Sequence, residues 1–224
     1  MTSYSELTTL PASDWPTYLG ERSGLPGPRA NLTLVAEAAR TANEETIEVL
    51  FADGGEYQMV CAAAAIGIHA NDSGFLDKAH ALSSNEMWRV QEGVIIGLQL
   101  LGDNSPQELE RIVELWADDP DPFVKRVAVA SICEPRLLKV PELATAAIRT
   151  CQRTTDFIAG LSKEELKSEA IRKLRQALGY CWSVAIVANP DSGLRAFRDL
   201  DTSDANVAWV VKQNLKKKRL SNLL

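Results

Sequence analysis

Residues 84–102 read SNEMWRVQEGVIIGLQLLG and predict a long helix that buries one face. Val90, Val94, Leu98 and Leu101 recur at three- and four-residue steps, which is the spacing of a single apolar stripe on a helix. A short polar stretch precedes Trp88. The segment therefore predicts an amphipathic helix that begins close to Trp88.

A similar pattern returns twice later in the chain. Residues 118–137 read DDPDPFVKRVAVASICEPRL, and residues 203–220 read SDANVAWVVKQNLKKKRL, with Val124 and Val207 in the place of Val90. A polar or proline-bearing turn followed by a helix, returning at irregular spacing, is typical of helical-hairpin repeats. No stretch alternates with a period of two, so we expect an all-α chain. The expected architecture is a short, curved, right-handed solenoid of about five HEAT-like hairpins.

The expected domain organisation is a lead-in over residues 1–30 and a single HEAT-like repeat domain over residues 31–224. The lead-in contains a Pro/Gly loop, SGLPGPRAN, and Asn31 is expected to cap a helix over 32–41. A long helix is expected over 163–188. Its second half, ALGYCWSVAIVA, is apolar on all sides and should be buried from several directions. The final helix is expected over 205–219.

Composition and charge are those of an ordinary globular protein. The chain has 224 residues, of which 46% are hydrophobic and 24% are charged. No apolar run is long enough to span a bilayer and the first residues lack signal-peptide features, so we expect a cytoplasmic protein with no membrane association. Residues 1–120 hold 6 Lys and Arg against 19 Asp and Glu, whereas the remainder holds 18 against 11. This asymmetry fits a polyanion-binding second half, two complementary halves, or merely a solvated surface.

The usual sequence signatures of metal, nucleotide and nucleophile sites are missing. There is no CxxC pair, Walker loop, GxGxxG or HExxH, and the chain has only two histidines. We therefore expect no metal site and no cofactor. Cys61, Cys133, Cys151 and Cys181 are widely spaced, mostly within apolar helical patterns. They are predicted to pack as small, reduced hydrophobic side chains, Cys181 together with Trp182.

Trp88 and Glu92 form the most suggestive pair of residues. Their spacing of four places an aromatic ring and a carboxylate on one helical face. Lys125 and Arg126 begin the corresponding helix of the next repeat, so a cation could approach this pair. Such a cleft could hold a cationic or electron-poor ring. In the alternative interpretation, which we favour, Trp88 is a core residue and Glu92 pairs with an arginine of a neighbouring repeat.

Three segments resemble parts of the bacterial HEAT-like DNA alkylation-repair glycosylases. Met87-Trp88 with Glu92 is similar to the Trp-x-x-x-Asp segment of that family. Trp116 followed by DDPDPFVKRVAV is similar to its segment of tryptophan, polar turn, aromatic residue, Arg-Arg and alanine. The stretch QALGY at 176–180, continuing to Asn-Pro-Asp at 189–191, is similar to its late Lys-Ala-Ile-Gly-Trp and Asn-Pro segment. The acid is Glu here where the family has Asp, and the basic pair is Lys-Arg in place of Arg-Arg.

The resemblance implies a concave basic surface that holds damaged duplex DNA without flipping the base. By this resemblance, Trp88 would contact the substrate and Glu92 would stabilise the developing cationic sugar. Arg126, or Lys125 in its place, would contact a phosphate.

A second group of candidate binding residues is basic and lies late in the chain. It consists of Arg172, Lys173 and Arg175 and of the tail residues Lys212, Lys216, Lys217, Lys218 and Arg219. Cations at a helix C-terminus are favoured by the backbone dipole alone, so the tail does not require a ligand. A nucleic acid or an acidic protein is the partner that such a cluster would bind.

The sequence thus favours a non-catalytic HEAT-like binding module that presents a groove to a protein or to duplex DNA, because no complete catalytic set is visible. The alternative is a glycosylase-like enzyme acting on alkylated bases in duplex DNA. The sequence does not predict the oligomeric state.

Overall fold

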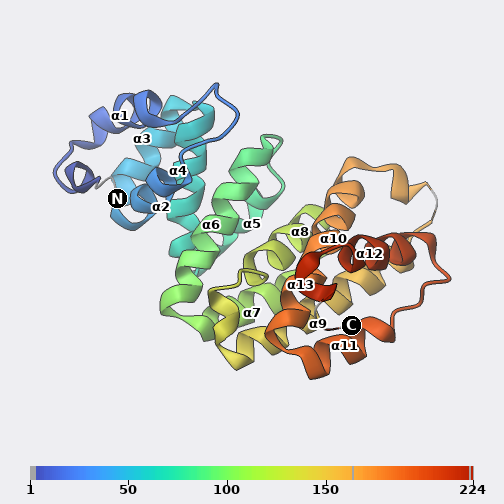
Figure 1. Ribbon diagram of the computed structural model, residues 1–224. Helices are drawn as coiled ribbons and strands as arrows, with labels where there is room; N and C mark the ends of the chain where they lie inside the picture. The colour runs from blue at the N-terminus through green and yellow to red at the C-terminus, as the bar shows by residue number, and fades with distance from the viewer. Residues whose placement is uncertain (1–3, 163, 222, 224) are drawn as a thin grey trace. The chain divides into compact units, whose positions relative to one another are not determined.

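The computed structural model describes residues 4–162, 164–221 and 223, and every regular element in this part of the chain is helical (Figure 1). The all-α prediction is therefore confirmed. The chain forms two compact units, Met1–Asn104 and Ser105–Leu224. The boundary between them falls inside the segment expected to form one repeat domain. The lead-in belongs to the first unit, where Trp15 and Leu19 are buried.

The elements of the first unit, within its described residues, are η1 (Ser5–Thr8), η2 (Ala12–Asp14), α1 (Trp15–Arg22), α2 (Leu32–Thr41), α3 (Glu44–Asp53), α4 (Glu56–Ile68), α5 (Ser73–Ser83) and α6 (Trp88–Asn104). Asn31 caps α2 as expected, because its side chain accepts a hydrogen bond from the backbone N–H of Leu34. The packing alternates along the chain: α2 packs on α4, and α4 packs on α6.

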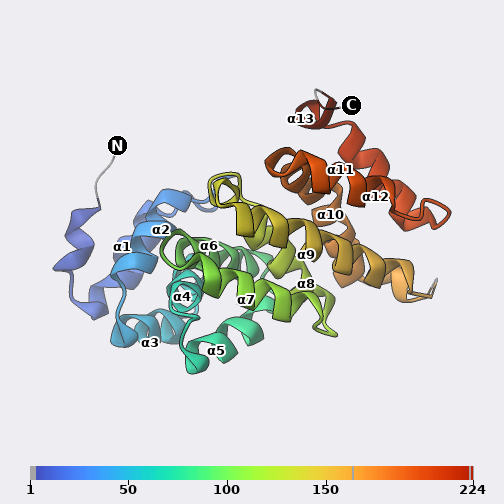
Figure 2. The same ribbon diagram turned by 90° about the horizontal axis from the view of Figure 1, so that it is seen from below.

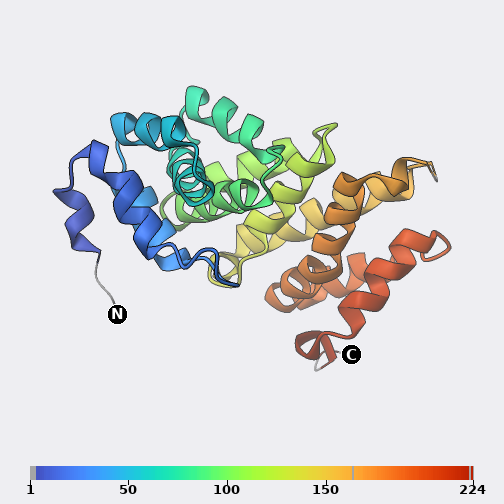
Figure 3. The ribbon, with the colours of Figure 1, turned by 90° about the horizontal axis from the view of Figure 1, so that it is seen from above.

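The pair α4 and α6 forms the centre of the first unit, and the two helices lie side by side (Figure 3). The apolar stripe of α6 is buried as predicted. A second face of α6 is buried through glycine: a Cβ on Gly93 would lie 2.5 Å from the carbonyl oxygen of Val60. A Cβ on Gly97 would lie 2.7 Å from the Cα of Gly67. The alanine-rich α4 and the glycines of α6 therefore let the two backbones touch.

The elements of the second unit, within its described residues, are α7 (Pro106–Ala117), α8 (Pro122–Ile132), η3 (Leu137–Lys139), α9 (Pro141–Ala159), η4 (Glu165–Lys167), α10 (Glu169–Ala188), α11 (Pro190–Arg198), α12 (Ala205–Leu215) and α13 (Lys218–Ser221). They pack in two layers. One layer contains α7, α9 and α11, and the other contains α8, α10 and α12 (Figure 2). Each of α7, α8, α9 and α10 thus packs on the helix two positions further along the chain.

The three segments with the repeated sequence pattern become α6, α8 and α12. Their equivalent valines, Val90, Val124 and Val207, are all buried. The aromatic positions of the pattern are less buried than the valines: Trp88 is 52% exposed, and Phe123, which precedes Val124, is only partly buried. The interpretation of Trp88 as a core residue is therefore wrong. Trp88 occupies the first turn of α6, before the stripe that begins at Val90 enters the core.

Two expected helices have different boundaries. The helix expected over 163–188 begins at Glu169, because the Ser168 side chain caps it by accepting a hydrogen bond from the N–H of Ile171. Lys163 lies outside the described residues. The helix expected over 205–219 ends at Leu215, and α13 starts three residues later. The tail cations therefore do not surround one continuous helix.

Candidate partner-binding surface

Trp88 and Glu92 lie one turn apart on α6, as their spacing predicts. The guanidinium of Arg89 lies 4.6 Å from the centroid of the Trp88 ring and also pairs with Glu56 at 2.8 Å. Glu92 is partly buried. An exposed tryptophan beside a carboxylate is therefore present, but a cation of the same unit already covers part of the ring.

Arg126 does not complete a catalytic set within this unit. It lies on α8, in the second unit, whereas Trp88 and Glu92 lie in the first. Neither unit by itself therefore contains all three residues that the resemblance assigns to catalysis.

Lys125 is not a surface residue, and its expected role as a phosphate contact is wrong. Its side chain is buried, Nζ donates a hydrogen bond to the carbonyl oxygen of Ala117, and Nζ lies 4.4 Å from the centroid of the Phe157 ring. Burial lowers the pKa of this amine, although the carboxylates of Asp118 and Asp119 act in the opposite direction. Lys125 thus joins α8 to the end of α7 and to α9.

The lowered pKa of Lys125 leads to a pH-dependent prediction. Between its folded-state pKa and the ordinary value of 10.5, the unfolded chain binds more protons, so the wild type gains stability as the pH rises through this interval. Lys125→Met removes this contribution. We expect the stability of Lys125→Met relative to wild type to be highest near neutral pH and to fall as the pH approaches 10.5. Urea unfolding of both proteins at several pH values measures this difference in the free energy of unfolding. Lys212→Met, which removes a charge from an exposed position, is the control, and a pH-independent difference for Lys125→Met would contradict the prediction.

The basic residues of α10 do not act together at its surface. Arg172 is exposed. Arg175 packs against α12, where Nη1 donates a hydrogen bond to Oδ1 of Asn206 at 2.8 Å and the guanidinium lies 4.8 Å from the centroid of the Trp209 ring. Lys173 is partly buried. Arg175 therefore serves the packing of α10 on α12, and Arg172 is the cation of this group that is fully available to solvent.

The tail cations divide into two sets. Lys212, Lys216 and Lys218 are exposed. Lys217 and Arg219 instead approach Tyr180 on α10, with Nζ of Lys217 and Cζ of Arg219 lying 5.4 Å and 4.7 Å from its ring centroid. Arg219 also donates a hydrogen bond to the Tyr180 hydroxyl at 2.9 Å. The structure thus brings two of the predicted tail cations to the second half of α10.

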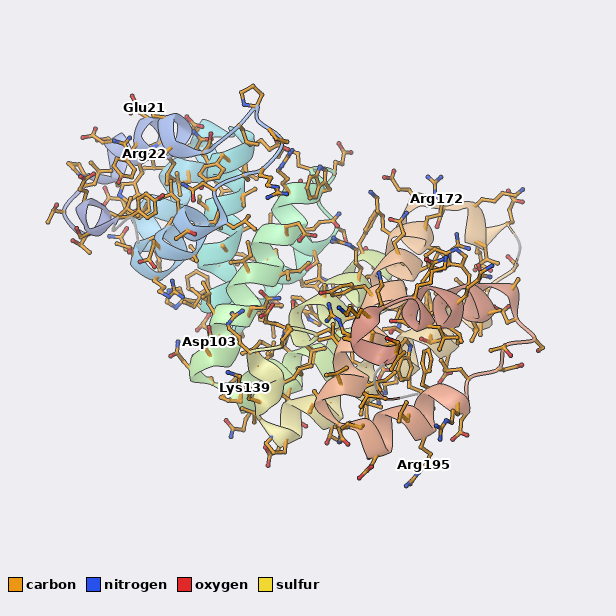
Figure 4. The ribbon with its side chains drawn as sticks, viewed as in Figure 1. Glu21, Arg22, Asp103, Lys139, Arg172 and Arg195 are labelled. Atoms are coloured by element: carbon orange, nitrogen blue, oxygen red, sulfur yellow. The ribbon has the colours of Figure 1, made fainter. Side chains whose placement is uncertain are left out.

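An open groove of about 460 Å³ lies beside these cations. Its apolar lining comes from two segments. The segment after α8 contributes Pro135 and Leu138, and the end of α10 contributes Val184, Val187 and Ala188. Lys139 and Arg219 are the charged residues that line it. Figure 4 shows Lys139 in the segment that joins α8 to α9. The groove therefore joins an apolar floor to cations from two different elements.

The lining of this groove was missed by the sequence reasoning, although one signal pointed to it. The second half of α10 is apolar on all sides and was expected to be buried from several directions. Most of it is buried by α8, α9, α11 and α12 as expected, but Tyr180 and Val187 are each 43% exposed. They stand seven residues apart, with Val184 between them, so all three lie on one face of the helix. An apolar helix with one uncovered face indicates a binding surface.

A second hollow lies between α7 and α9, and the cations and carboxylates that line it neutralise one another. Arg149 pairs with Glu110 at 2.8 Å and also with Glu114, and Arg153 pairs with Asp118 at 3.2 Å. Because these cations already have carboxylate partners, the hollow offers less to a charged ligand than the groove does.

The cysteines are buried and free, so the predicted packing is confirmed. Sγ of Cys133 lies 3.7 Å from Sγ of Cys151. The hydrogen bond between Cys133 and Cys151 raises the pKa of Cys133, the one between Cys133 and Cys181 raises the pKa of Cys181, and burial raises the pKa of Cys151. These thiols are therefore protonated at neutral pH and are poor nucleophiles. Trp182 is fully buried beside Cys181, which agrees with a packing role for this pair.

Within the described residues, no helix is long and apolar enough to cross a membrane. The same part of the chain contains no group of three or more His, Cys, Asp or Glu side chains suited to a metal ion. Comparisons with family models, with curated proteins and with solved structures find no match to this chain. The groove and its neighbouring cations are thus the main basis for a functional proposal.

Proposed function

We propose that this chain is a non-catalytic binding module built from HEAT-like helical hairpins, and that its second unit binds a protein partner. Most helices pack on the helix two positions further along, which supports the repeat architecture because stacked hairpins place equivalent helices next to each other. The observation that carries the binding proposal is the apolar groove at the end of α10.

A protein partner fits this surface better than a nucleic acid does. Phosphate binding requires a dense set of free cations. Of the cations expected to contact nucleic acid, Lys125 is buried and Arg175 is engaged with α12. A partly exposed apolar helix face, by contrast, is the usual centre of a protein interface.

Site-specific photo-crosslinking tests the proposal. A benzophenone amino acid is placed at Val187, in the groove, or at Leu115, which is 57% exposed on α7 and serves as the control. In cells that naturally make the protein, we expect Val187 to yield a discrete crosslinked protein that Leu115 does not yield. Crosslinking only to nucleic acid, equal products at both positions, or no product at Val187 would refute it.

The second candidate is the DNA glycosylase-like activity implied by the sequence resemblance. The exposure of Trp88 favours it, since a tryptophan in the core could not touch a base. The separation of the three candidate residues between two units gives no support to it. The test is whether the purified chain releases alkylated bases from duplex DNA. If it does, and if Trp88→Ala abolishes the release, the glycosylase proposal replaces the binding proposal.

A further inference from the structure

We propose that the groove binds a short acidic segment of a protein partner, in which an aliphatic side chain is flanked by carboxylates. This inference rests on the proposed function and names the chemistry of the partner at the same surface.

The floor of the groove selects for an aliphatic side chain. Val184, Val187 and Ala188 lie within one turn or so of each other at the end of α10, and Pro135 and Leu138 face them from the segment after α8. Val187 and Pro135 are exposed, whereas Val184 and Leu138 are buried beneath them. The side chains of the floor are aliphatic and carry no hydrogen-bonding group, so an apolar group gains most by entering it.

The rim of the groove selects for negative charge. Lys139 and Arg219 line it from two separate elements, and Lys217 lies near Arg219 at the Tyr180 ring. In the part of the chain that the structure describes, none of these three cations is in an ion pair. Glu134, close to Pro135 in sequence, is already paired with Arg136 at 3.2 Å. The rim therefore has net positive charge that a partner can neutralise.

Tyr180 holds Arg219 in place at this rim. The hydrogen bond to the hydroxyl and the contact with the ring face both restrict the arginine, and both leave guanidinium N–H groups to donate. A carboxylate arriving at the groove thus meets a cation whose position is set in advance.

Nucleic acid is a poorer occupant of this groove than an acidic peptide. A phosphate backbone would pair with the cations of the rim. It has no apolar group of matching shape to cover the aliphatic floor. A peptide with Leu, Ile or Val between Asp or Glu residues satisfies both features. Charge complementarity at the rim would mainly set which peptide binds, and the floor would add affinity.

Selection from a random peptide library displayed on phage tests this inference with the whole 224-residue chain. We expect the wild type to enrich peptides that carry an aliphatic residue flanked by acidic residues. In fluorescence anisotropy with one enriched peptide, Lys139→Glu with Arg219→Glu should lose at least about tenfold in affinity. Val187→Glu, which places a negative charge in the floor, should lose a similar factor.

The matched control is Arg195→Glu with Arg198→Glu, which changes the net charge by the same amount. Both arginines are exposed on α11, and neither lines the groove. Figure 4 shows Arg195 well away from Lys139. This control should keep affinity within about twofold, since exposed distant charges are screened by salt. Circular dichroism verifies that every variant is folded.

Three results would overturn the inference: no enriched peptide, enriched peptides without acidic residues, or equal losses in the groove variants and in the control. If the peptide inference fails while Val187 still crosslinks to a protein, the proposed function survives and the partner has a different chemistry. If both experiments fail, the groove is not a protein-binding surface.

Discussion

Gly97→Ala is expected to destabilise the first unit by about 2–4 kcal/mol, although alanine is the better helix former. A Cβ on Gly97 would lie 2.7 Å from the Cα of Gly67 and would also clash with the carbonyl oxygen of Ala64. Both neighbours are backbone atoms of α4, so neither can rotate away as a side chain would. The helices would have to separate along the contact that forms the centre of the unit.

Urea unfolding followed by circular dichroism measures this effect. Gly160→Ala is the matched control: Gly160 has right-handed helical backbone angles, and the nearest atoms to its added Cβ would be 3.8 Å away. It should stay within about 0.5 kcal/mol of wild type. Helix propensity alone predicts that Gly97→Ala is about 1 kcal/mol more stable than wild type. A stabilised Gly97→Ala variant would thus contradict the close backbone contact between α4 and α6.

Trp182→Ala is expected to cost about 3–5 kcal/mol in the second unit. Trp182 is fully buried on α10, where Nε1 donates a hydrogen bond to Oγ1 of Thr155 at 3.0 Å. Its ring lies 5.5 Å, between centroids, from the ring of Phe197 on α11. Its removal leaves a large cavity where α9, α10 and α11 meet and deprives a buried hydroxyl of its donor.

Trp88→Ala is the control for this substitution because it removes the same side chain from a position that is 52% exposed. Its expected cost is below about 1 kcal/mol. Guanidinium unfolding followed by circular dichroism compares the two variants without relying on tryptophan fluorescence. Equal losses would show that Trp88 is a core residue after all. A folded Trp88→Ala protein is also the variant required for the base-release assay.

Much of the helical framework could be predicted because it depends on local periodicity. The stripe from Val90 to Leu101 is buried as expected, and Asn31 caps α2. The break between Leu215 and Lys218 could not be predicted, since the segment contains no glycine or proline and its lysines are good helix formers. The end of α12 coincides with the buried side chain of Asn214, which donates hydrogen bonds to the carbonyls of Leu178 and Val210.

The candidate site was predictable only in fragments. Arg219 and Lys217 were identified from the basic tail, but their contact with Tyr180 joins residues nearly 40 positions apart. Lys125 was expected to contact a phosphate by the family resemblance, yet its side chain is buried and its amine donates to the Ala117 carbonyl. Trp88 was interpreted as a core residue, yet it lies outside the buried stripe and is 52% exposed.

The sequence by itself determined that the chain is helical, where most helices begin, and which faces of those helices are apolar. These properties follow from capping residues and from a period of 3.6 residues, which act over a few positions. The tertiary structure decided which apolar faces are covered. Tyr180 and Val187 belong to the same all-apolar stretch as the buried Trp182, and no local feature separates them. The packing of other helices on α10 buries Trp182 and leaves Tyr180 and Val187 partly exposed, because burial depends on contacts between distant segments.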